Sequence, residues 1–487
     1  MTKASLVVAS NRGPVSISVG SDGEEQTVRG GGGLVSGMQA ALDSAGDAVW
    51  VCSAMTDRER SVARRAGGAP LTFSGSGGDD AAGGDFDVVM LPIDGVTFRR
   101  AYNGIANATL WFVLHMLFEP TRRPLFDAAW RGQWAAYERY NQSFAEAVDR
   151  VAEEGATVMV QDYHLFLLPA LLRERRPDLK IGFFTHTPWV SPDYFGLLPD
   201  DVAHDILSGI LGADVVGFHT WRWAEQFQQC CQAVLGKVPH DQLQVYGLTA
   251  DAQEMAGLQR QADVRSAVRE LREEIGDRLV IGRVDRAELS KNVYRGLLAY
   301  RELLHRFPQW QSRVVHAVFD NPSREDIPEY REYTAAVERL GREIDEEFGT
   351  DDWTPLLLTI EQDYPSALAA LTLTDVVFIN SVRDGMNLVA FEAVLLSERD
   401  PVMVLSRETG AADVLGADAL LVNPYDVGQT AAALDQALTT VQRERESGEE
   451  TGHERSARLR ASASQFPPAE WFDEQLRQVR SAAKNSS

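Results

Sequence analysis

The chain has 487 residues, of which 44% are hydrophobic and 24% are charged, a composition typical of globular proteins rather than disordered or membrane-embedded ones. Its formal net charge of −24 would repel phosphate backbones over most of the surface, which argues against nucleic acid and anionic lipid as partners. A site for a phosphate group must therefore be a local cluster of cations.

The length suggests two large domains, because a single hydrophobic core rarely serves so long a chain. The cysteines Cys52, Cys230 and Cys231 show no C-x-x-C spacing and no histidine at ligand distance, so we expect reduced thiols. The first nine residues lack a basic and apolar leader, and no apolar run reaches about 18 residues. We therefore expect a cytoplasmic protein that binds small molecules rather than membranes, with its oligomeric state left open.

Short apolar runs alternate with segments of helical period along the first half of the chain. Near-continuous apolar strands between helices are typical of a parallel sheet covered on both faces. The predicted strands are residues 6–9, 49–52, 88–91, 157–160, 181–184 and 214–218. Residues 66–85 are dense in Gly, Ser, Ala and Asp and are predicted to form a solvated loop.

A second series of apolar runs follows a charge-mixed stretch at residues 249–278. Its predicted strands are residues 279–282, 314–319, 356–360, 376–379, 402–405 and 420–422. Two such series predict an α/β chain with two doubly wound, Rossmann-like domains facing across a cleft, each binding ligands at the carboxyl ends of its strands. We expect domains at residues 1–248 and 249–465, and a helix within 466–487 that returns to the first domain before a frayed tail.

Glycines and polar residues mark candidate ligand loops in the first half. Ser10-Asn11-Arg12 follows the first predicted strand, and four glycines, among them Gly32 and Gly33, precede a helical pattern. Backbone N–H groups at such a helix start can approach a donor phosphate, although a plain flexible loop has the same composition. Asp162 and His186 follow two successive strands, which places them on adjacent loops at one sheet edge.

The second half carries cations and a glycine-bearing turn at equivalent places. Arg283, Lys291 and Arg324 come just after the first two strands of this series, which suggests an anion pocket in a chain poor in lysine. Residues 383–389 follow the strand at 376–379 and lead into a helix that contains Glu392. Such a turn into a helix N-terminus offers N–H groups to a diphosphate, and Glu392 could accept hydrogen bonds from ribose hydroxyls.

In this order, these motifs resemble those of the trehalose-6-phosphate synthases, retaining glycosyltransferases of the GT-B fold classed as glycosyltransferase family 20. The resemblance covers nearly the whole chain. The matching segments are Ser10-Asn11-Arg12, Gln161-Asp162-Tyr163-His164, Phe183-Phe184-Thr185-His186-Thr187-Pro188, Arg383-Asp384-Gly385-Met386-Asn387-Leu388 and Val422-Asn423-Pro424-Tyr425-Asp426. The combination is specific to the family, whereas no single segment is.

The resemblance implies retaining glucosyl transfer from a nucleotide-diphosphoglucose to glucose 6-phosphate, which gives α,α-trehalose 6-phosphate without a metal or other cofactor. The first domain would bind the acceptor and the second the donor. The implied acceptor residues are Arg12, Tyr102, Trp111 and Arg324 for the phosphate and Asp162 for hydroxyls. The implied donor residues are Arg283 and Lys291 for the diphosphate, Asp384, Gly385, Met386, Asn387, Leu388 and Val389 for sugar and phosphates, His186 for the 6-hydroxyl region and Glu392 for the ribose.

The implied mechanism needs no carboxylate nucleophile. The bond between C1 and the diphosphate oxygen breaks, Arg283 and Lys291 stabilise the departing charge, and the acceptor hydroxyl attacks from the same face. Its proton passes to the departing phosphate oxygen, with Asp384 and His186 holding the hexose.

Two departures from the family pattern leave alternatives open. Ser53 stands where many members carry a tryptophan, which keeps open a pseudo-glycosyltransferase that joins a nucleotide-cyclitol to an aminocyclitol phosphate. The family spacing Arg-x-Asp-Tyr-x-Lys is lengthened between Arg283 and Lys291, which puts the donor base in doubt. That lengthened loop and the Arg- and Ala-rich composition favour GDP-glucose over UDP-glucose. A non-catalytic sugar-phosphate sensor is a third alternative, and it predicts loss of the cations.

Overall fold

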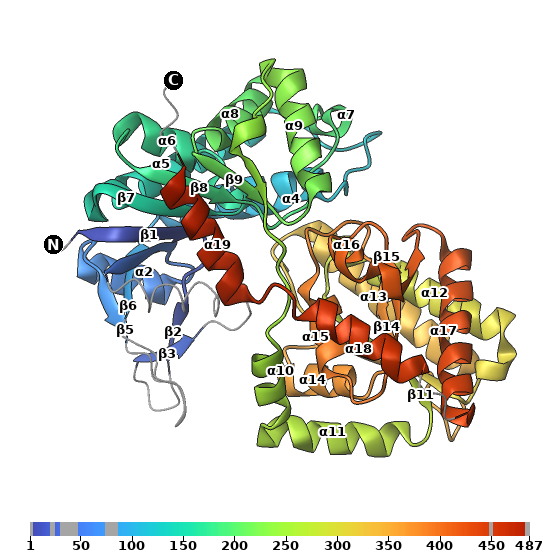
Figure 1. Ribbon diagram of the computed structural model, residues 1–487. Coiled ribbons are helices and arrows are strands. Elements are labelled where there is room, and N and C mark those ends of the chain that lie inside the picture. The colour runs from blue at the N-terminus through green and yellow to red at the C-terminus, as the bar shows by residue number, and fades with distance from the viewer. Residues whose placement is uncertain (1–2, 20–24, 30–46, 74–85, 448–450, 483–487) are drawn as a thin grey trace. The chain divides into compact units, whose positions relative to one another are not determined.

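The computed structural model describes residues 3–19, 25–29, 47–73, 86–447 and 451–482 (Figure 1). It divides into two compact units. Unit 1 contains Met1–Gly247 and Pro468–Ser487, and unit 2 contains Leu248–Pro467. Each unit is built around one main sheet, so the predicted α/β class with two doubly wound sheets is confirmed. None of the described helices is long and apolar enough to cross a lipid bilayer.

The main sheet of unit 1 has the strand order β10-β9-β8-β7-β1-β4-β6-β5, and its neighbours are parallel except β5 and β6. The strands are β1 (Ala4–Ser10), β4 (Ala48–Ser53), β5 (Leu71–Phe73), β6 (Phe86–Leu91), β7 (Ala152–Gln161), β8 (Lys180–Phe184), β9 (Val215–Phe218) and β10 (Leu243–Val245). A separate antiparallel hairpin pairs β2 (Val15–Val19) with β3 (Glu25–Arg29).

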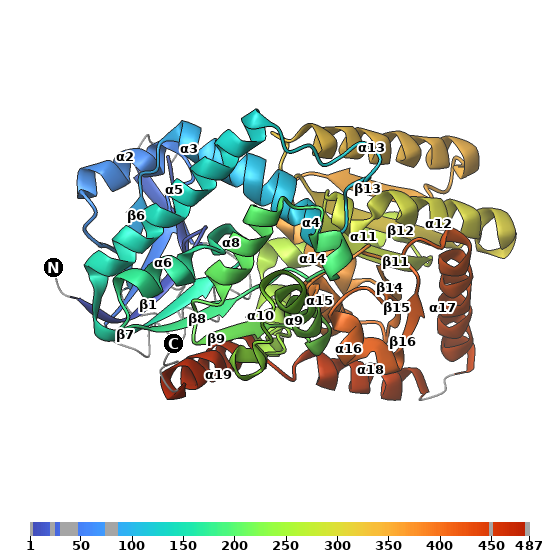
Figure 2. The same cartoon turned by 90° about the horizontal axis from the view of Figure 1, so that it is seen from above.

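The strands are apolar on both faces, so helices cover both sides of this sheet. They are α2 (Asp57–Ala66), α3 (Gly95–Arg99), α4 (Trp111–Leu114), α5 (Ala128–Val151), α6 (Leu168–Arg175), α7 (Pro192–Phe195), α8 (Asp200–Ile210), α9 (Trp221–Leu235) and α19 (Pro468–Ser481), with a π-helix η1 (Arg100–Leu110) and the 3-10 turns η2 (Tyr163–Leu165) and η3 (His240–Gln242). Helix α5 packs on β1, β4 and β6, and α19 packs on β7, β8 and β9 from the other face (Figure 2).

Unit 2 contains an all-parallel sheet with the strand order β13-β12-β11-β14-β15-β16. Its strands are β11 (Leu279–Arg286), β12 (Val314–Asn321), β13 (Leu356–Ile360), β14 (Val376–Ile379), β15 (Val402–Ser406) and β16 (Ala419–Val422). Its helices are α10 (Ala252–Gln259), α11 (Ala262–Ile275), α12 (Val293–Arg306), α13 (Pro328–Phe348), α14 (Tyr364–Thr372), α15 (Leu388–Leu396), α16 (Ala411–Leu415), α17 (Val427–Ser447) and α18 (Thr451–Ala463), with the 3-10 turns η4 (Leu289–Lys291), η5 (Pro308–Trp310) and η6 (Gly416–Asp418).

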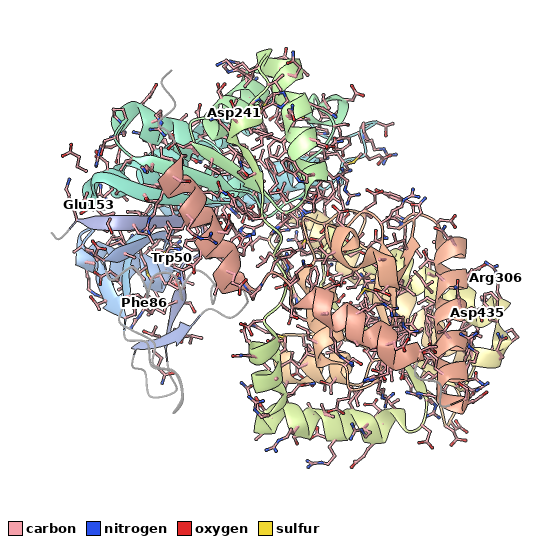
Figure 3. The ribbon with its side chains drawn as sticks, viewed as in Figure 1. Trp50, Phe86, Glu153, Asp241, Arg306 and Asp435 are labelled. Carbon is pink, nitrogen blue, oxygen red and sulfur yellow. The ribbon has the colours of Figure 1, made fainter. Side chains whose placement is uncertain are left out.

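The apolar runs from which the strands are predicted supply much of the hydrophobic core of each unit. Trp50 on β4 is buried at 1% exposure inside unit 1, and in unit 2 Arg306 and Asp435 mark the neighbouring helices α12 and α17 (Figure 3). The three cysteines are buried and unpaired, as the sequence predicts.

Several elements were not predicted. Residues 71–73 form β5 inside the segment expected to be a loop, because Leu71 and Phe73 pair with the edge of β6. The hairpin β2–β3 and the short edge strand β10 were also missed. The difference that matters most is the length of β11, which continues through Arg286 instead of ending at Gly282. Gly32 and Gly33 lie outside the described residues.

Candidate functional site

The carboxyl end of β1 carries the first predicted ligand loop, and a chain of neutral hydrogen bonds holds it. Trp50 Nε1 donates to Ser10 Oγ at 2.7 Å, and that hydroxyl donates to the Arg12 carbonyl at 2.6 Å. Behind the loop, Tyr140 OH donates to Asn11 Oδ1 at 2.6 Å. These bonds fix the backbone of residues 10–12 from inside the unit and leave the Arg12 side chain exposed.

Ser53, the residue at the position where the sequence departs from the family tryptophan, is buried and hydrogen-bonded inside unit 1. Its hydroxyl lies 2.7 Å from Tyr140 OH, and the residue is 3% exposed. Because Tyr140 gives its only proton to Asn11, Ser53 must be the donor in this pair. Ser53 is therefore part of the internal support of the Asn11 loop.

Aromatic rings position Arg12 and Tyr102. The hydroxyl of Tyr102 lies 3.5 Å from Arg12 Nη2, and its ring stacks between Phe98 and His164 with centroid distances of 5.2 and 5.6 Å. Tyr102 belongs to the π-helix η1, an uncommon conformation that is frequent at functional sites.

Trp111 follows directly after that π-helix and is 8% exposed. Its ring stacks on His115 with a centroid distance of 3.8 Å and contacts Tyr163 at 5.6 Å. The structure therefore brings Arg12 and Tyr102 into contact, and links Trp111 to the Tyr163-His164 segment that also holds Tyr102.

Asp162 and His186 lie together at the ends of β7 and β8, as predicted. Asp162 has a positive φ of 73°, and its Oδ1 accepts the backbone N–H of His186 at 3.1 Å. The His186 Nε2 lies 3.1 Å from Gln161 Oε1, and its ring contacts Trp471 of α19 at 5.5 Å. Burial and the neighbouring His219 lower the pKa of His186 well below its ordinary value, so the imidazole is neutral at pH 7.

In unit 2, Lys291 and Asp384 form the centre of the predicted donor site. Lys291 Nζ lies 2.6 Å from Asp384 Oδ2, which also accepts from Asn387 Nδ2 at 3.1 Å. Burial lowers the pKa of Lys291, but Asp384 and Asp285 outweigh it and raise the pKa above its ordinary value. The lysine therefore stays charged although its side chain is only 11% exposed.

The glycine-bearing turn leads into α15 as predicted. Asn387 has a positive φ of 74°, and its Oδ1 caps the helix by accepting from Ala390 N at 3.2 Å. Backbone bonds from Gly410 N to Asp384 O and from Ala411 N to Met386 O hold the turn at 3.2 and 2.8 Å. The amides of Leu388 and Val389 at the start of α15 have no acceptor within the helix and are suited to phosphate oxygens.

Glu392 lies one turn into α15 and is half-buried. Burial and the nearby Glu254 raise its pKa to about 7. Its carboxyl group is therefore not an ordinary solvated glutamate, and in its ionised form it can accept hydrogen bonds from a diol.

Arg283 does not occupy the place predicted for it. Because β11 continues to Arg286, Arg283 lies within the strand, where its side chain is 1% exposed. Its guanidinium forms an ion pair with Asp285 at 2.9 Å and donates to Asn380 Oδ1 and to the Lys291 carbonyl. All these partners are internal, so the geometry does not support direct contact between Arg283 and a diphosphate.

Arg286 is the cation that the sequence reasoning missed. It ends β11 with a half-exposed side chain and pairs with Glu288 at 2.9 Å. Counted from Arg286, the segment Arg286-Ala287-Glu288-Leu289-Ser290-Lys291 has the family spacing Arg-x-Asp-Tyr-x-Lys with no insertion. This spacing could have identified Arg286 from the sequence alone. Because the loop is not lengthened when it is counted from Arg286, it gives no reason to expect a different donor base.

Arg324 joins the same group of charges. Its side chain is 9% exposed, lies 3.2 Å from Glu288 Oε2 and donates to Tyr330 OH at 2.6 Å. Burial raises the pKa of Glu288, but Arg286 and Arg324 lower it to about 2. Unit 2 thus gathers Arg286, Lys291 and Arg324 at the carboxyl ends of β11 and β12. Among the described residues, no group of three or more His, Cys, Asp or Glu side chains could hold a metal ion.

A family model described as glycosyltransferase family 20 matches residues 4–477, nearly the whole chain. The chain belongs to glycosyltransferase family 20. The α,α-trehalose-phosphate synthase (UDP-forming) 1 of Arabidopsis thaliana is 34% identical over 367 residues, which are 73% of this chain and 39% of that protein. The UDP-forming synthase of Schizosaccharomyces pombe is 33% identical over 73% of this chain and 71% of its own length.

Solved structures of family members match over the full length. An α,α-trehalose-phosphate synthase (UDP-forming) from Burkholderia vietnamiensis aligns with 98% of this chain and 99% of its own at 28% identity and a TM-score of 0.79. The E. coli protein bound with UDP-2-fluoro glucose aligns with the same shares at 26% identity and a TM-score of 0.80. These similarities assign the GT-B fold. The chain spans 39 to 58% of the length of the first four curated relatives.

The names of these relatives bear on the predicted donor. Those of Arabidopsis and S. pombe are called UDP-forming, and the E. coli structure contains a UDP-sugar. The predicted preference for GDP-glucose therefore has no support among them.

Proposed function

We propose that the chain transfers glucose, with retention at C1, from a nucleotide-diphosphoglucose to glucose 6-phosphate and so produces α,α-trehalose 6-phosphate. The observation that carries this proposal is the position of Lys291, which stands at the family spacing from Arg286 and lies 2.6 Å from Asp384, a residue of the turn that leads into α15. Two cations and a helix N-terminus suit a leaving nucleoside diphosphate. The family membership and the synthase names of the relatives support the same reaction.

In the proposed division of labour, unit 2 binds the donor. Arg286 and Lys291 neutralise the diphosphate as the bond to C1 breaks, and the amides of residues 385–389 bind the phosphates and the sugar. Asp384, which is fixed by Lys291 and Asn387, accepts hydrogen bonds from the hexose hydroxyls. Glu392 binds the ribose. Arg283, whose partners are all internal, is not one of the proposed donor contacts.

Unit 1 binds the acceptor in this proposal. Arg12 and Tyr102 contact the sugar phosphate together with Trp111, and Arg324 of unit 2 contributes a further cation. Asp162 orients acceptor hydroxyls, and the neutral His186 can donate to or accept from the 6-hydroxyl of the donor hexose. The attacking hydroxyl then approaches on the side of the leaving group, and its proton passes to the departing phosphate oxygen.

The donor base is a separate part of the proposal. The UDP-forming relatives favour UDP-glucose, and the spacing counted from Arg286 removes one of the two reasons for expecting GDP-glucose. Incubation of the full chain with UDP-, GDP- or ADP-glucose and glucose 6-phosphate, followed by NMR of the product, tests both reaction and donor. We expect an α,α-linked disaccharide phosphate and one nucleoside diphosphate per bond formed.

Two controls separate the alternatives. An aminocyclitol phosphate offered as acceptor tests the pseudo-glycosyltransferase, which Ser53 kept open, and turnover with this acceptor alone would overturn the proposal. The variants Arg286→Ala and Arg313→Ala compare a site cation with an exposed arginine that directly precedes β12. We expect only the first to abolish transfer. Binding of glucose 6-phosphate without turnover by any donor would instead identify a sensor.

A further inference from the structure

Arg283 occupies an interior slot that is shaped for its guanidinium. A Cβ atom on Gly296 of α12 would lie only 2.7 Å from Nη1, so a larger residue there would displace the group. The ring of Phe378 lies 5.7 Å from the guanidinium carbon, and Asn380 Oδ1 accepts from Nη1. An arginine that is 1% exposed and fitted in this way has a specific task inside the unit.

The slot connects Arg283 to the backbone of Lys291. Its Nη2 donates to the Lys291 carbonyl, at the end of the turn η4. The next residue, Asn292, has a positive φ of 62°, and its Nδ2 donates to Asn380 O and Pro424 O at 2.8 Å each. The main chain that carries Lys291 is therefore held on both sides, by Arg283 and by Asn292.

Arg283 also controls the charge next to Lys291. The Asp285 carboxylate lies between the two cations, with Oδ2 at 2.9 Å from Arg283 and Oδ1 at 3.7 Å from Lys291 Nζ. A second buried carboxylate, Asp320, is the register partner of Asp285 on β12. Without Arg283, these two acids would have Lys291 as their nearest cation, and the ammonium would be drawn toward Asp285.

We propose that Arg283 is a positioning residue that keeps the Lys291 ammonium directed at Asp384 and at the donor diphosphate instead of at Asp285. This inference rests on the proposed function, because it assumes that Lys291 contacts the leaving group. Arg283 itself touches no substrate.

The first test replaces Arg283 by methionine, which fills the slot without charge or donors. Arg283→Met is expected to lower kcat/KM for the nucleotide-glucose by about a hundredfold, the cost of displacing a catalytic group by about 1 Å. It should also weaken binding of UDP and GDP, measured by calorimetry, and leave KM for glucose 6-phosphate within about twofold, since no acceptor residue moves.

The second test removes the charge that pulls on Lys291. In Arg283→Met/Asp285→Asn the neutral amide no longer attracts the ammonium, so the second substitution is expected to restore about tenfold of the lost kcat/KM. If Arg283 only stabilised the fold, Asp285→Asn would not restore kcat/KM in a double variant that has the same melting temperature as Arg283→Met. The matched control is Leu303→Ala, a buried core residue of α12, which should lower the melting temperature and leave nucleotide affinity unchanged.

Each possible result of these experiments either supports or overturns the proposal. Wild-type nucleotide affinity and kcat in Arg283→Met, the same affinity loss in Leu303→Ala, or no recovery with Asp285→Asn would overturn the proposal. Failure of the proposed function looks different, because the wild-type chain would then transfer no sugar from any donor in the panel. In that case the affinities for UDP and GDP would still report whether Arg283 positions Lys291.

Discussion

The two units build their ligand loops from different interactions. In unit 1, Arg12, Tyr102 and Asp162 are held by neutral hydrogen bonds, stacked rings and a backbone N–H. In unit 2, Lys291 and Arg324 are held by carboxylates whose side chains are between 0% and 16% exposed. A neutral support depends on shape, whereas a buried ion pair depends on the charge of both partners. Removal of the Lys291 charge from unit 2 should therefore cost far more than removal of one hydroxyl from unit 1.

The largest effect is expected for Lys291→Ala. This change deletes the leaving-group cation and leaves Asp384 and Asp285 without their shared partner, so kcat should fall by about 10³-fold, or about 4 kcal/mol. Single-turnover kinetics with the best donor measure it. A loss below tenfold would show that the unit 2 cluster is not catalytic and would remove the contrast between the units.

Asp162→Asn should have a smaller effect. The amide oxygen can still accept from His186 N, so the loop is kept, and only the negative charge offered to the acceptor is lost. We expect kcat/KM for glucose 6-phosphate to fall by about 10- to 100-fold, with nucleotide affinity unchanged. Equal losses of nucleotide affinity and acceptor kcat/KM would mean that Asp162 serves both substrates.

Tyr140→Phe tests the neutral support directly. The change leaves Asn11 Oδ1 and Ser53 Oγ without their shared partner in the interior, so the free energy of unfolding should decrease by about 1–3 kcal/mol. KM for the acceptor should rise only a few-fold, because the loop shifts without losing a charge. Urea unfolding and acceptor titration measure the two effects. An unchanged unfolding midpoint would contradict the network.

The smallest effect is expected for Asp320→Asn, and it depends on pH. Burial, opposed by Arg283, raises the pKa of Asp320 to about 7 from its ordinary 3.8. A raised carboxyl pKa means that ionisation of the folded chain costs stability as pH rises from about 4 to 7, and the full cost remains above 7. The variant should therefore be more stable than wild type at pH 8, by at least about 1 kcal/mol, and the gain should shrink at pH 5. Thermal melts at both pH values measure it, and a gain independent of pH would contradict the assignment.

Much of the fold and part of the site could be predicted from the sequence. The apolar runs predict the main strands of both sheets, and Asp162 and His186 are brought together because carboxyl ends of neighbouring parallel strands share an edge. The pairing of Lys291 with Asp384 was not predicted, because 93 residues separate the partners. The π-helix that carries Tyr102 was also missed, since its residues have no distinctive period.

The sequence by itself determined the α/β class, the order of the strands along the chain and the family motifs, because burial of apolar runs and short glycine-bearing turns are local properties. Only the tertiary structure decided which arginine serves which purpose. Arg283 and Arg286 look alike in the sequence, but β11 pairs with β12 through Arg286, and the slot for Arg283 is made by Gly296, Phe378 and Asn380. A charge can be buried only where distant partners compensate it, and those partners come together only in the folded chain.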